Sequence, residues 1–339
     1  MPVAFVTGGT GFLGLNLIEQ LLAESWKVVA LHRPTANLRH LCEKDIQLVE
    51  GSITEPNSLV TVFPEKVDAV FHIAGNTNLW SRRNHIQTRD NVEGTKNMVA
   101  AALKRQSKRF IHTSSTAAYG HHQQRIDEET QSNAIHSPIN YHRTKYLAEM
   151  EVRKGIEKGL DAVMLNPANI IGPYDYNNWS QLFILIDRQK LPGVPPATQT
   201  FCHVSEVVKA HITAFYRGKK GENYILGGVK ADFLTLSKEI GDMLGKQTPK
   251  RTTPGWILKL LGRVSLWGSY ITGKEPDITP EKAILITNQI LCNSQKAEKE
   301  LDYHSVALRS MLEDCYQWML SEKLIGKKGE NSSINEYKK

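Results

Sequence analysis

The feature that most constrains this chain is a glycine-rich turn close to its N-terminus. Gly8, Gly11 and Gly14 follow a short apolar run, residues 3–6, and open an apolar stretch at helical spacing, residues 12–22. Glycines between a strand and a helix permit a tight bend and let the backbone approach a pyrophosphate, which the first amides of the helix then bind. The turn therefore predicts a dinucleotide-binding site rather than an ordinary loop.

Short apolar strands alternate with helical stretches through the first half of the chain. The strands expected after the first are residues 27–31, 46–50, 69–73, 109–113 and 162–165, and the helices are residues 91–105 and 141–158. This alternation predicts an α/β fold, namely a Rossmann-type doubly wound parallel sheet with right-handed crossovers.

The pattern changes after Asn166, where proline and glycine become more frequent. A smaller, mostly helical C-terminal substrate lobe is expected there. The expected boundaries are a Rossmann domain over 1–170, completed by part of 200–228, and a substrate lobe over 171–199 and 229–325. Residues 326–339 are rich in Lys, Gly, Asn and Ser without an apolar period, which predicts a disordered tail.

Composition excludes several classes of protein. The chain is 40% hydrophobic and 23% charged, and its net charge of +7 is spread among acids rather than clustered, so we expect no nucleic-acid partner. No apolar run reaches the roughly 20 residues of a bilayer span, so no integral membrane association is expected. Cys42, Cys202, Cys292 and Cys315 are far apart and no export signal is apparent, which predicts a cytoplasmic protein without a metal site.

The residues after the second expected strand help to choose the dinucleotide. An acid at this point binds the ribose hydroxyls of NAD, whereas an arginine accommodates the 2′-phosphate of NADP. The sequence here is His32-Arg33-Pro34, with no carboxylate and with Arg39 shortly after it. A guanidinium suits a phosphate, so NADP(H) is favoured, with NAD(H) as the alternative.

A tyrosine and a lysine share one face of an expected helix. Tyr141 and Lys145 are four residues apart, and a lysine cation beside a phenol lowers the phenol's pKa. Such a tyrosine can exchange protons with a carbonyl or alcohol near neutral pH. The expected strand 109–113 ends in Ser114-Ser115, at the sheet edge where ligands of open α/β folds bind, and a hydroxyl there can bind the reacting oxygen.

Together these motifs resemble the extended, or atypical, short-chain dehydrogenase/reductase family, also described as the NAD-dependent epimerase/dehydratase family. The resemblance extends from Met1 to about Trp318, and further matching segments lie at 70–74, 91–95, 172–173 and 203–208. It is closest in pattern to bacterial dihydroflavonol 4-reductase-like reductases. The resemblance implies an NAD(P)-dependent oxidoreductase that acts on a small molecule.

The resemblance also implies a role for individual residues. Ser115, Tyr141 and Lys145 are the implied catalytic group, and Lys145 also bonds the nicotinamide ribose. The implied cofactor contacts are Gly8, Gly11, Phe12, Leu13, Gly14, Arg33, Ser52, Ile53, Ala74, Gly75, Tyr141, Lys145 and Pro167. Ser52 stands where many members carry an aspartate. The implied substrate contacts are Trp80, Ser115, Asn169 and Trp179, while Asn91 is expected to brace its helix.

Three branches of the family remain open. The first is a reductase that uses NADPH on a ketone or aldehyde, and the second is a sugar-nucleotide epimerase or dehydratase that uses NAD. Sugar-nucleotide members place an arginine two residues before an aromatic residue where this chain has Gln199-Thr200-Phe201, although Asn169 matches an epimerase-like asparagine. The third is a nucleotide-sensing relative without catalysis, which the intact Tyr141 and Lys145 disfavour. We favour the reductase.

Bulky apolar residues bear on the substrate and on the oligomeric state. Trp80, Trp179 and Phe183 are assigned to the second lobe and suit an apolar or aromatic substrate, unless they form the core of that lobe. The segment 256–271 is apolar with scattered cations, and it is interpreted as a substrate lid or as a helix on a membrane surface.

Many members of the family dimerise through two helices, which implies a homodimer for this chain. The corresponding helices are 91–105 and 141–158. Their expected apolar stripe consists of Val99, Leu103, Leu147 and Met150.

Overall fold

The computed structural model describes residues 1–326, which divide into two units. The first unit comprises Met1–Ala168, Ser205–Gly227 and Cys292–His304, and the second comprises Asn169–Val204, Gly228–Leu291 and the chain from Ser305 onward. The tail expected over 326–339 lies, apart from Gly326, outside the described residues.

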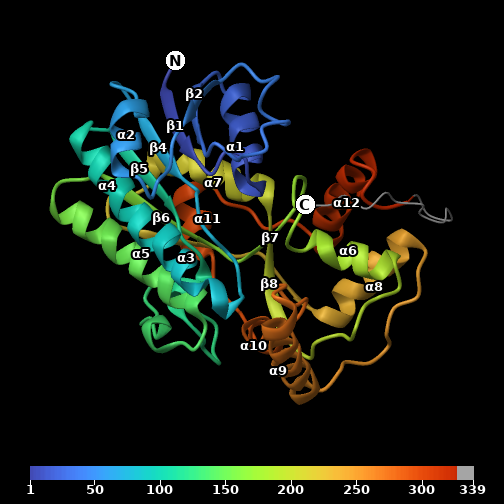
Figure 1. Ribbon diagram of the computed structural model, residues 1–339. Coiled ribbons are helices and arrows are strands. Elements are labelled where there is room, and N and C mark those ends of the chain that lie inside the picture. Colours follow the sequence, from blue (N-terminus) through green and yellow to red (C-terminus); the bar gives the residue numbers. More distant parts are fainter. Residues whose placement is uncertain (327–339) are drawn as a thin grey trace. The chain divides into compact units, whose positions relative to one another are not determined.

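The first unit is built on a seven-stranded parallel sheet (Figure 1). Its strands are β1 (Val3–Thr7), β2 (Lys27–His32), β3 (Gln47–Glu50), β4 (Ala69–His72), β5 (Arg109–Thr113), β6 (Ala162–Pro167) and β9 (Asn223–Leu226). Their order is β3-β2-β1-β4-β5-β6-β9, which confirms the doubly wound Rossmann-type sheet. Because all pairs are parallel, every strand ends at the same edge of the sheet.

Helices cover both faces of this sheet because successive strand residues point to opposite sides. On one face, α2 (Pro56–Val62), α4 (Gly94–Lys104) and α5 (Asn140–Glu157) pack against alternate strand residues such as Phe5 and Phe110. On the other face, α1 (Phe12–Ala23) approaches Val6 and Ala30, and Trp26 stacks edge-on against Phe71 and against Phe215 of α7 (Val204–Arg217).

Two features of the first unit differ from the expected organisation. The helix expected over 91–105 begins as a π-helix, Arg89–Glu93, before α4. The segment Cys292–His304, which was expected in the substrate lobe, belongs to the first unit, where it includes α11 (Gln295–Leu301). The reason is local pairing: Cys292 forms a β-bridge with Ile126 and its carbonyl accepts a hydrogen bond from Arg125 Nε at 2.9 Å.

Short helices connect β4, β5 and α5 on the first unit. They are η1 (Ser81–Arg83), α3 (Asn84–Thr88), η3 (Thr116–Tyr119) and η4 (Ala134–His136). Trp80 lies at the start of this series, so its assignment to the second lobe was wrong. The loop before it is fixed by Gln87, whose Nε2 donates to the carbonyls of Asn76 and Asn78.

The second unit combines a three-stranded mixed sheet with helices. Its strands are β7 (Asn169–Ile171), β8 (Thr198–His203) and β10 (Val229–Asp232), and its helices are α6 (Ser180–Asp187), α8 (Phe233–Leu244), α9 (Gly255–Thr272), α10 (Pro280–Thr287) and α12 (Leu308–Ser321). Phe183 is fully buried in the core of this unit with Phe201, Leu236 and Met311, so it serves packing rather than substrate binding. Within residues 1–326, no helix is both long and apolar enough to cross a membrane.

Candidate active site

The glycine turn is packed against the strand beside it. Gly8 has a φ of +75°, and a Cβ at this position would lie 2.7 Å from the backbone nitrogen of Ala74. A Cβ at Gly14 would lie 2.1 Å from the carbonyl oxygen of Gly8. Neither position can accept a side chain, because the atoms that it would meet belong to the backbone.

The first turn of α1 is suited to an anion. Gly11 caps the helix without a side-chain hydrogen bond, and no acidic residue lies in the first turn. The amides of Phe12, Leu13 and Gly14 therefore have no competing carboxylate beside them, and the helix dipole adds positive potential. The turn thus fits the pyrophosphate of a dinucleotide.

The other expected cofactor residues of the first unit lie where strands end. Arg33 follows β2, Ser52 and Ile53 follow β3, Ala74 and Gly75 follow β4, Ser115 follows β5, and Pro167 is the last residue of β6. The parallel sheet brings these positions, which span more than 130 residues of sequence, to the edge that carries the glycine turn.

Ser52 and Ile53 take part in local packing as well. The Ser52 hydroxyl pairs with Thr54 Oγ1 at 2.9 Å, inside the turn that follows β3. Ile53 packs against Gly94 at the start of α4, where an added Cβ would lie 2.6 Å from Ile53 Cδ1. The serine that stands in the usual aspartate position therefore has its hydroxyl engaged within its own turn.

The three expected catalytic residues are brought together by β5 and α5. The Ser115 side chain acts on the Tyr141 phenol, whose pKa it lowers. Lys145 is buried, its Nζ donates to the carbonyl of Thr113 at 3.0 Å, and the same atom lies 6.0 Å from the centre of the Tyr141 ring. A Cβ at Gly75 would be 3.3 Å from that Nζ, so the lysine also borders the loop after β4.

The prediction that Lys145 lowers the pKa of Tyr141 was wrong. Burial raises the pKa of the Tyr141 phenol, and only the Ser115 side chain opposes that rise. Burial also lowers the pKa of Lys145 to about 8, against the attraction of Glu149. The phenol is therefore protonated at neutral pH, which is the form that donates a proton.

Asn91, which was expected to brace its own helix, bonds instead to the loop after β4 and to α5. Its Oδ1 accepts a hydrogen bond from the Asn76 amide at 2.6 Å, and its Nδ2 donates to the Asn76 carbonyl and to Thr144 Oγ1, both at 3.0 Å. Since Thr144 precedes Lys145, this asparagine connects the loop that follows β4 to the catalytic helix.

Sequence reasoning missed Glu149, which is 5% exposed and accepts hydrogen bonds from three sides. Its carboxylate is bonded by Ser114 Oγ from β5, by Asn166 Nδ2 from β6 at 2.6 Å and by Asn223 Nδ2 from β9 at 3.1 Å. Asn223 Nδ2 also donates to Asn166 Oδ1 at 2.9 Å. The available signal was the spacing, because Glu149 follows Lys145 by four residues on the same helix face.

The expected substrate residues are divided between the units. Trp80 is buried in the first unit, with the guanidinium carbons of Arg82 and Arg83 at 5.3 and 5.6 Å from its ring centre. In the second unit, Trp179 packs edge-on against Phe201 with ring centres 4.9 Å apart, and Asn169 Nδ2 donates to Gln199 Oε1 and to the Thr200 carbonyl.

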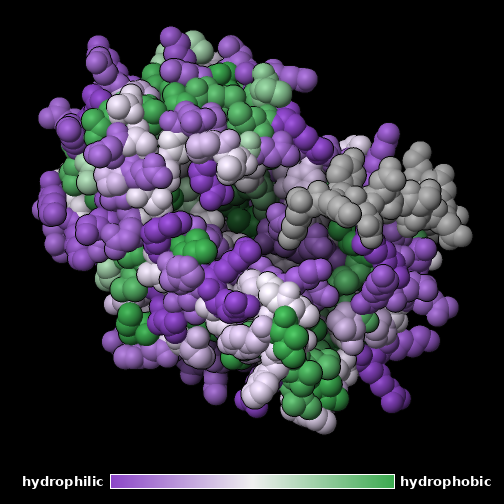
Figure 2. Space-filling view, viewed as in Figure 1, coloured by the Kyte–Doolittle hydropathy of each residue, from purple (hydrophilic) through white to green (hydrophobic). Residues whose placement is uncertain are grey.

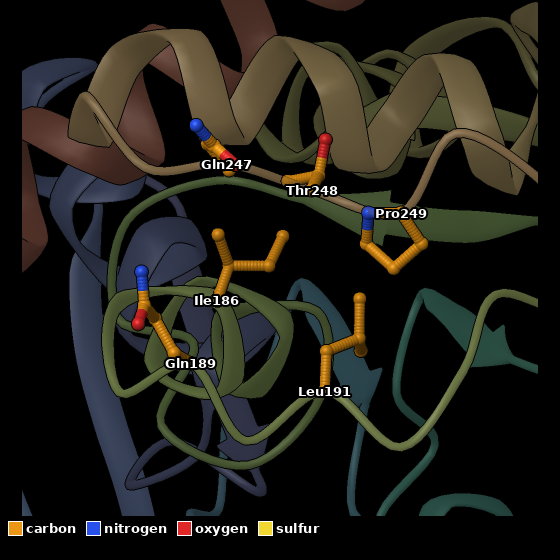
Figure 3. A pocket seen from close by; sticks show the side chains of 6 residues that line it. All are labelled: Ile186, Gln189, Leu191, Gln247, Thr248 and Pro249. Carbon is orange, nitrogen blue, oxygen red and sulfur yellow. The ribbon is translucent and has the colours of Figure 1, made fainter.

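A hollow of about 260 Å³ in the second unit lies apart from all of these residues (Figure 3). Ile186, Gln189 and Leu191 face Gln247, Thr248 and Pro249 across it. Because none of the residues that line the hollow has a side chain that titrates near neutral pH, the hollow offers no acid or base for proton transfer.

The arrangement of a glycine turn, a serine and a Tyr/Lys pair is found within a known protein family. The model of the NAD dependent epimerase/dehydratase family matches residues 4–227, which include the whole of that arrangement. The chain belongs to this family. Its members include reductases, epimerases and dehydratases, and they are NAD(P)-dependent enzymes.

Relatives within the NAD-dependent epimerase/dehydratase family fall into both enzymatic branches. A Synechocystis sp. protein provisionally named dihydroflavonol 4-reductase is 29% identical, with 93% of each chain covered. The human dTDP-D-glucose 4,6-dehydratase is 26% identical over 74% of this chain and 77% of its own. Among solved structures, gox2253 is 30% identical with a TM-score of 0.82, covering 96% of this chain and all of that one.

Gly11 and Gly14 provide a matched pair that separates cofactor binding from folding. A Cβ at Gly11 would meet only the Gly8 carbonyl, at 3.3 Å, whereas one at Gly14 would meet backbone at 2.1 Å. We expect Gly11→Ala to keep the wild-type melting temperature and to bind the dinucleotide at least about tenfold more weakly, because the methyl group stands where the pyrophosphate approaches. Gly14→Ala should lower stability by about 1–3 kcal/mol as well. Thermal unfolding and fluorescence titration measure both effects, and wild-type affinity in Gly11→Ala would contradict the assignment of the turn.

Proposed function

We propose that this chain is an NADP(H)-dependent reductase that converts a ketone or aldehyde into an alcohol, with Tyr141 as the general acid. The reductase name carried by the Synechocystis relative supports this reaction, as does a Stigmatella aurantiaca ketoreductase that is 27% identical over 88% of this chain. The alternative is a sugar-nucleotide epimerase or dehydratase. The state of Gln199 supports the reductase.

Gln199 occupies the position at which sugar-nucleotide members place an arginine for the diphosphate. Here the residue is neutral, is 2% exposed and has both ends of its amide engaged. Its Oε1 accepts from Asn169, and its Nε2 donates to the carbonyls of Leu285 and Asn288 at 2.9 and 3.3 Å. The site therefore has no cation at this position to pair with a diphosphate, which favours an uncharged carbonyl substrate.

Each catalytic residue has one task in the proposed reduction. NADPH, when bound, supplies the hydride that forms the new C–H bond at the carbonyl carbon. Tyr141 donates its phenolic proton to the carbonyl oxygen, so the C=O bond becomes C–O–H, and the Ser115 hydroxyl binds the same oxygen. Lys145 holds the ribose, and the phenolate that remains on Tyr141 takes up a proton from solvent.

The alternatives have weaker support from this chain. The epimerase-like Asn169 has its amide nitrogen committed to Gln199 and Thr200, so that match in sequence does not leave a free donor for a sugar. A nucleotide sensor without catalysis has no need for Ser115, Tyr141 and Lys145 together, and this chain retains all three.

A substrate panel tests the proposed reaction. We expect turnover when NADPH is mixed with apolar or aromatic ketones and aldehydes, and no conversion of UDP- or dTDP-sugars with NAD, because the diphosphate has no arginine partner at residue 199. NADPH absorbance and product chromatography measure the two outcomes. Conversion of a sugar nucleotide without net cofactor oxidation would establish the epimerase instead.

Tyr141→Phe is the matched variant for this panel, because it removes only the phenolic oxygen. It should retain cofactor affinity and melting temperature and lose about 10²- to 10⁴-fold in turnover, as expected for a missing general acid. Lys145→Ala should weaken cofactor binding and turnover together. Wild-type turnover in Tyr141→Phe, on a substrate for which chemistry limits the rate, would rule out the assigned general acid.

We also propose a preference for NADPH, supported by the exposed Arg33 directly after β2. The neighbouring acid, Glu50, lies on β3 opposite His32 rather than at the end of β2. Arg33→Ala should weaken NADPH binding by about 10- to 100-fold, the effect of about 1.5–3 kcal/mol from a charge-assisted contact, and should leave NADH binding unchanged. Lys27→Ala, at the opposite end of the same strand, is the control. Fluorescence titration of both cofactors measures the ratio, and a ratio that Arg33→Ala does not alter would remove the preference.

A cytoplasmic homodimer completes the proposal. Leu147 and Met150 are half-buried on α5 and are offered to a partner, whereas Val99 is buried in the core of the first unit, and Leu103 of α4 packs against that core. Light scattering at micromolar concentration should give twice the chain mass of 38.2 kDa. Leu147→Glu should shift that mass toward the monomer, and a monomeric wild-type protein would refute dimerisation.

A further inference from the structure

The helix α9 of the second unit exposes large apolar side chains along most of its length. Trp256 is 68% exposed, Trp267 is 76% exposed and Ile271 is 90% exposed, and Leu260, Val264 and Tyr270 are exposed as well. Figure 2 shows a group of hydrophobic residues in green at the lower edge of the view, where Figure 1 labels α9. Contiguous exposed apolar surface of this kind marks an interaction site.

The exposed residues form one stripe. Trp256, Leu260, Val264, Trp267 and Ile271 follow one another at intervals of three or four residues, which keeps them on a single face of the helix. The opposite face is buried through Leu258, Gly262 and Ser269, and a Cβ at Gly262 would lie 3.0 Å from the carbonyl oxygen of Thr279, just before α10. The buried face of α9 therefore contains two small residues, Gly262 and Ser269, whereas its large apolar side chains are exposed. An ordinary surface helix has the opposite arrangement, with its large apolar side chains buried.

The charges around the stripe have one sign. Between Gly255 and Thr272 the helix contains Lys259 and Arg263, both exposed, and no aspartate or glutamate. Over residues 250–277 there are five lysines and arginines against two acids, and both acids follow the end of the helix. Tryptophan and tyrosine beside lysine and arginine are typical of helices that lie at the interface between lipid and water.

From this combination we propose that α9 docks the protein on the surface of a membrane that contains anionic lipids. The stripe enters the boundary between headgroups and acyl chains, and Lys259 and Arg263 contact the lipid phosphates. A second copy of the chain fits the surface less well. A two-fold contact through the stripe would bring the two cations of one copy toward those of the other, with no acid on either helix to neutralise them. The docking does not depend on the proposed reaction.

Flotation of the full-length protein with vesicles tests this proposal. We expect binding to phosphatidylcholine vesicles that contain phosphatidylglycerol, and binding at least about tenfold weaker to phosphatidylcholine alone, because the two cations lose their partners. The triple variant Trp256→Ser, Trp267→Ser and Ile271→Ser should lose at least about tenfold in binding to the anionic vesicles while keeping the wild-type melting temperature, since these side chains are exposed. Lys259→Glu with Arg263→Glu should abolish the preference for anionic lipid.

Val60→Ser with Ile135→Ser is the matched control, because both residues are exposed and apolar but lie on the first unit. This variant should float as the wild type does. The proposal is overturned by a lack of flotation with anionic vesicles, or by undiminished flotation of the triple variant. A triple variant that is monomeric in light scattering where the wild type is dimeric would assign the stripe to a second copy. A triple variant that floats normally but loses turnover on a water-soluble carbonyl would assign it to a substrate lid.

Discussion

The buried carboxylate of Glu149 is the interaction on which the geometry of the catalytic group depends. It joins α5, which carries Tyr141 and Lys145, to the ends of β5 and β6 through Ser114 and Asn166. Removing a carboxylate from water costs several kcal/mol, and this one recovers that cost only because Ser114, Asn166 and Asn223 all present donors to it. A glutamine at this position has the same size, but its amide nitrogen is a donor and could not accept hydrogen bonds from Ser114, Asn166 and Asn223. Glu149 therefore helps to position Ser115, which follows Ser114, relative to Tyr141, which lies two turns earlier on α5.

The sequence was sufficient to predict those parts of the site that depend on local spacing. The glycine turn follows from three residues within seven positions, and the shared face of Tyr141 and Lys145 follows from helical periodicity. Contacts between distant segments could not be read in this way. Asn223 is separated from Glu149 by 74 residues, and the bridge from Ile126 to Cys292, which draws the segment 292–304 into the first unit, spans more than twice that distance.

The sequence pattern also could not predict how deeply Tyr141 and Lys145 are buried, and this burial reversed the expected direction of the Tyr141 pKa shift. A lysine one turn from a phenol lowers the phenol's pKa when its cation faces the oxygen, but Lys145 directs its Nζ to the Thr113 carbonyl. Desolvation then dominates, so the phenol keeps its proton. This state suits the direction of carbonyl reduction, in which the tyrosine begins as a donor. The same interaction of lysine with the strand end places the ammonium group beside Gly75, at the edge that carries the glycine turn.

Substrate choice in this family depends on groups outside the parallel sheet that binds the cofactor. In the second unit of this chain, two buried polar side chains are uncharged and bonded to each other. Gln199 and Asn169 satisfy one another and nearby carbonyls, so their burial has little cost, and neither side chain carries a charge. The same unit carries two exposed cations, Lys259 and Arg263, on α9 at the border of an exposed apolar stripe. Each large apolar side chain left in water forgoes about 1.5–3 kcal/mol that burial would provide. The stripe is best explained by a surface outside the chain that covers it.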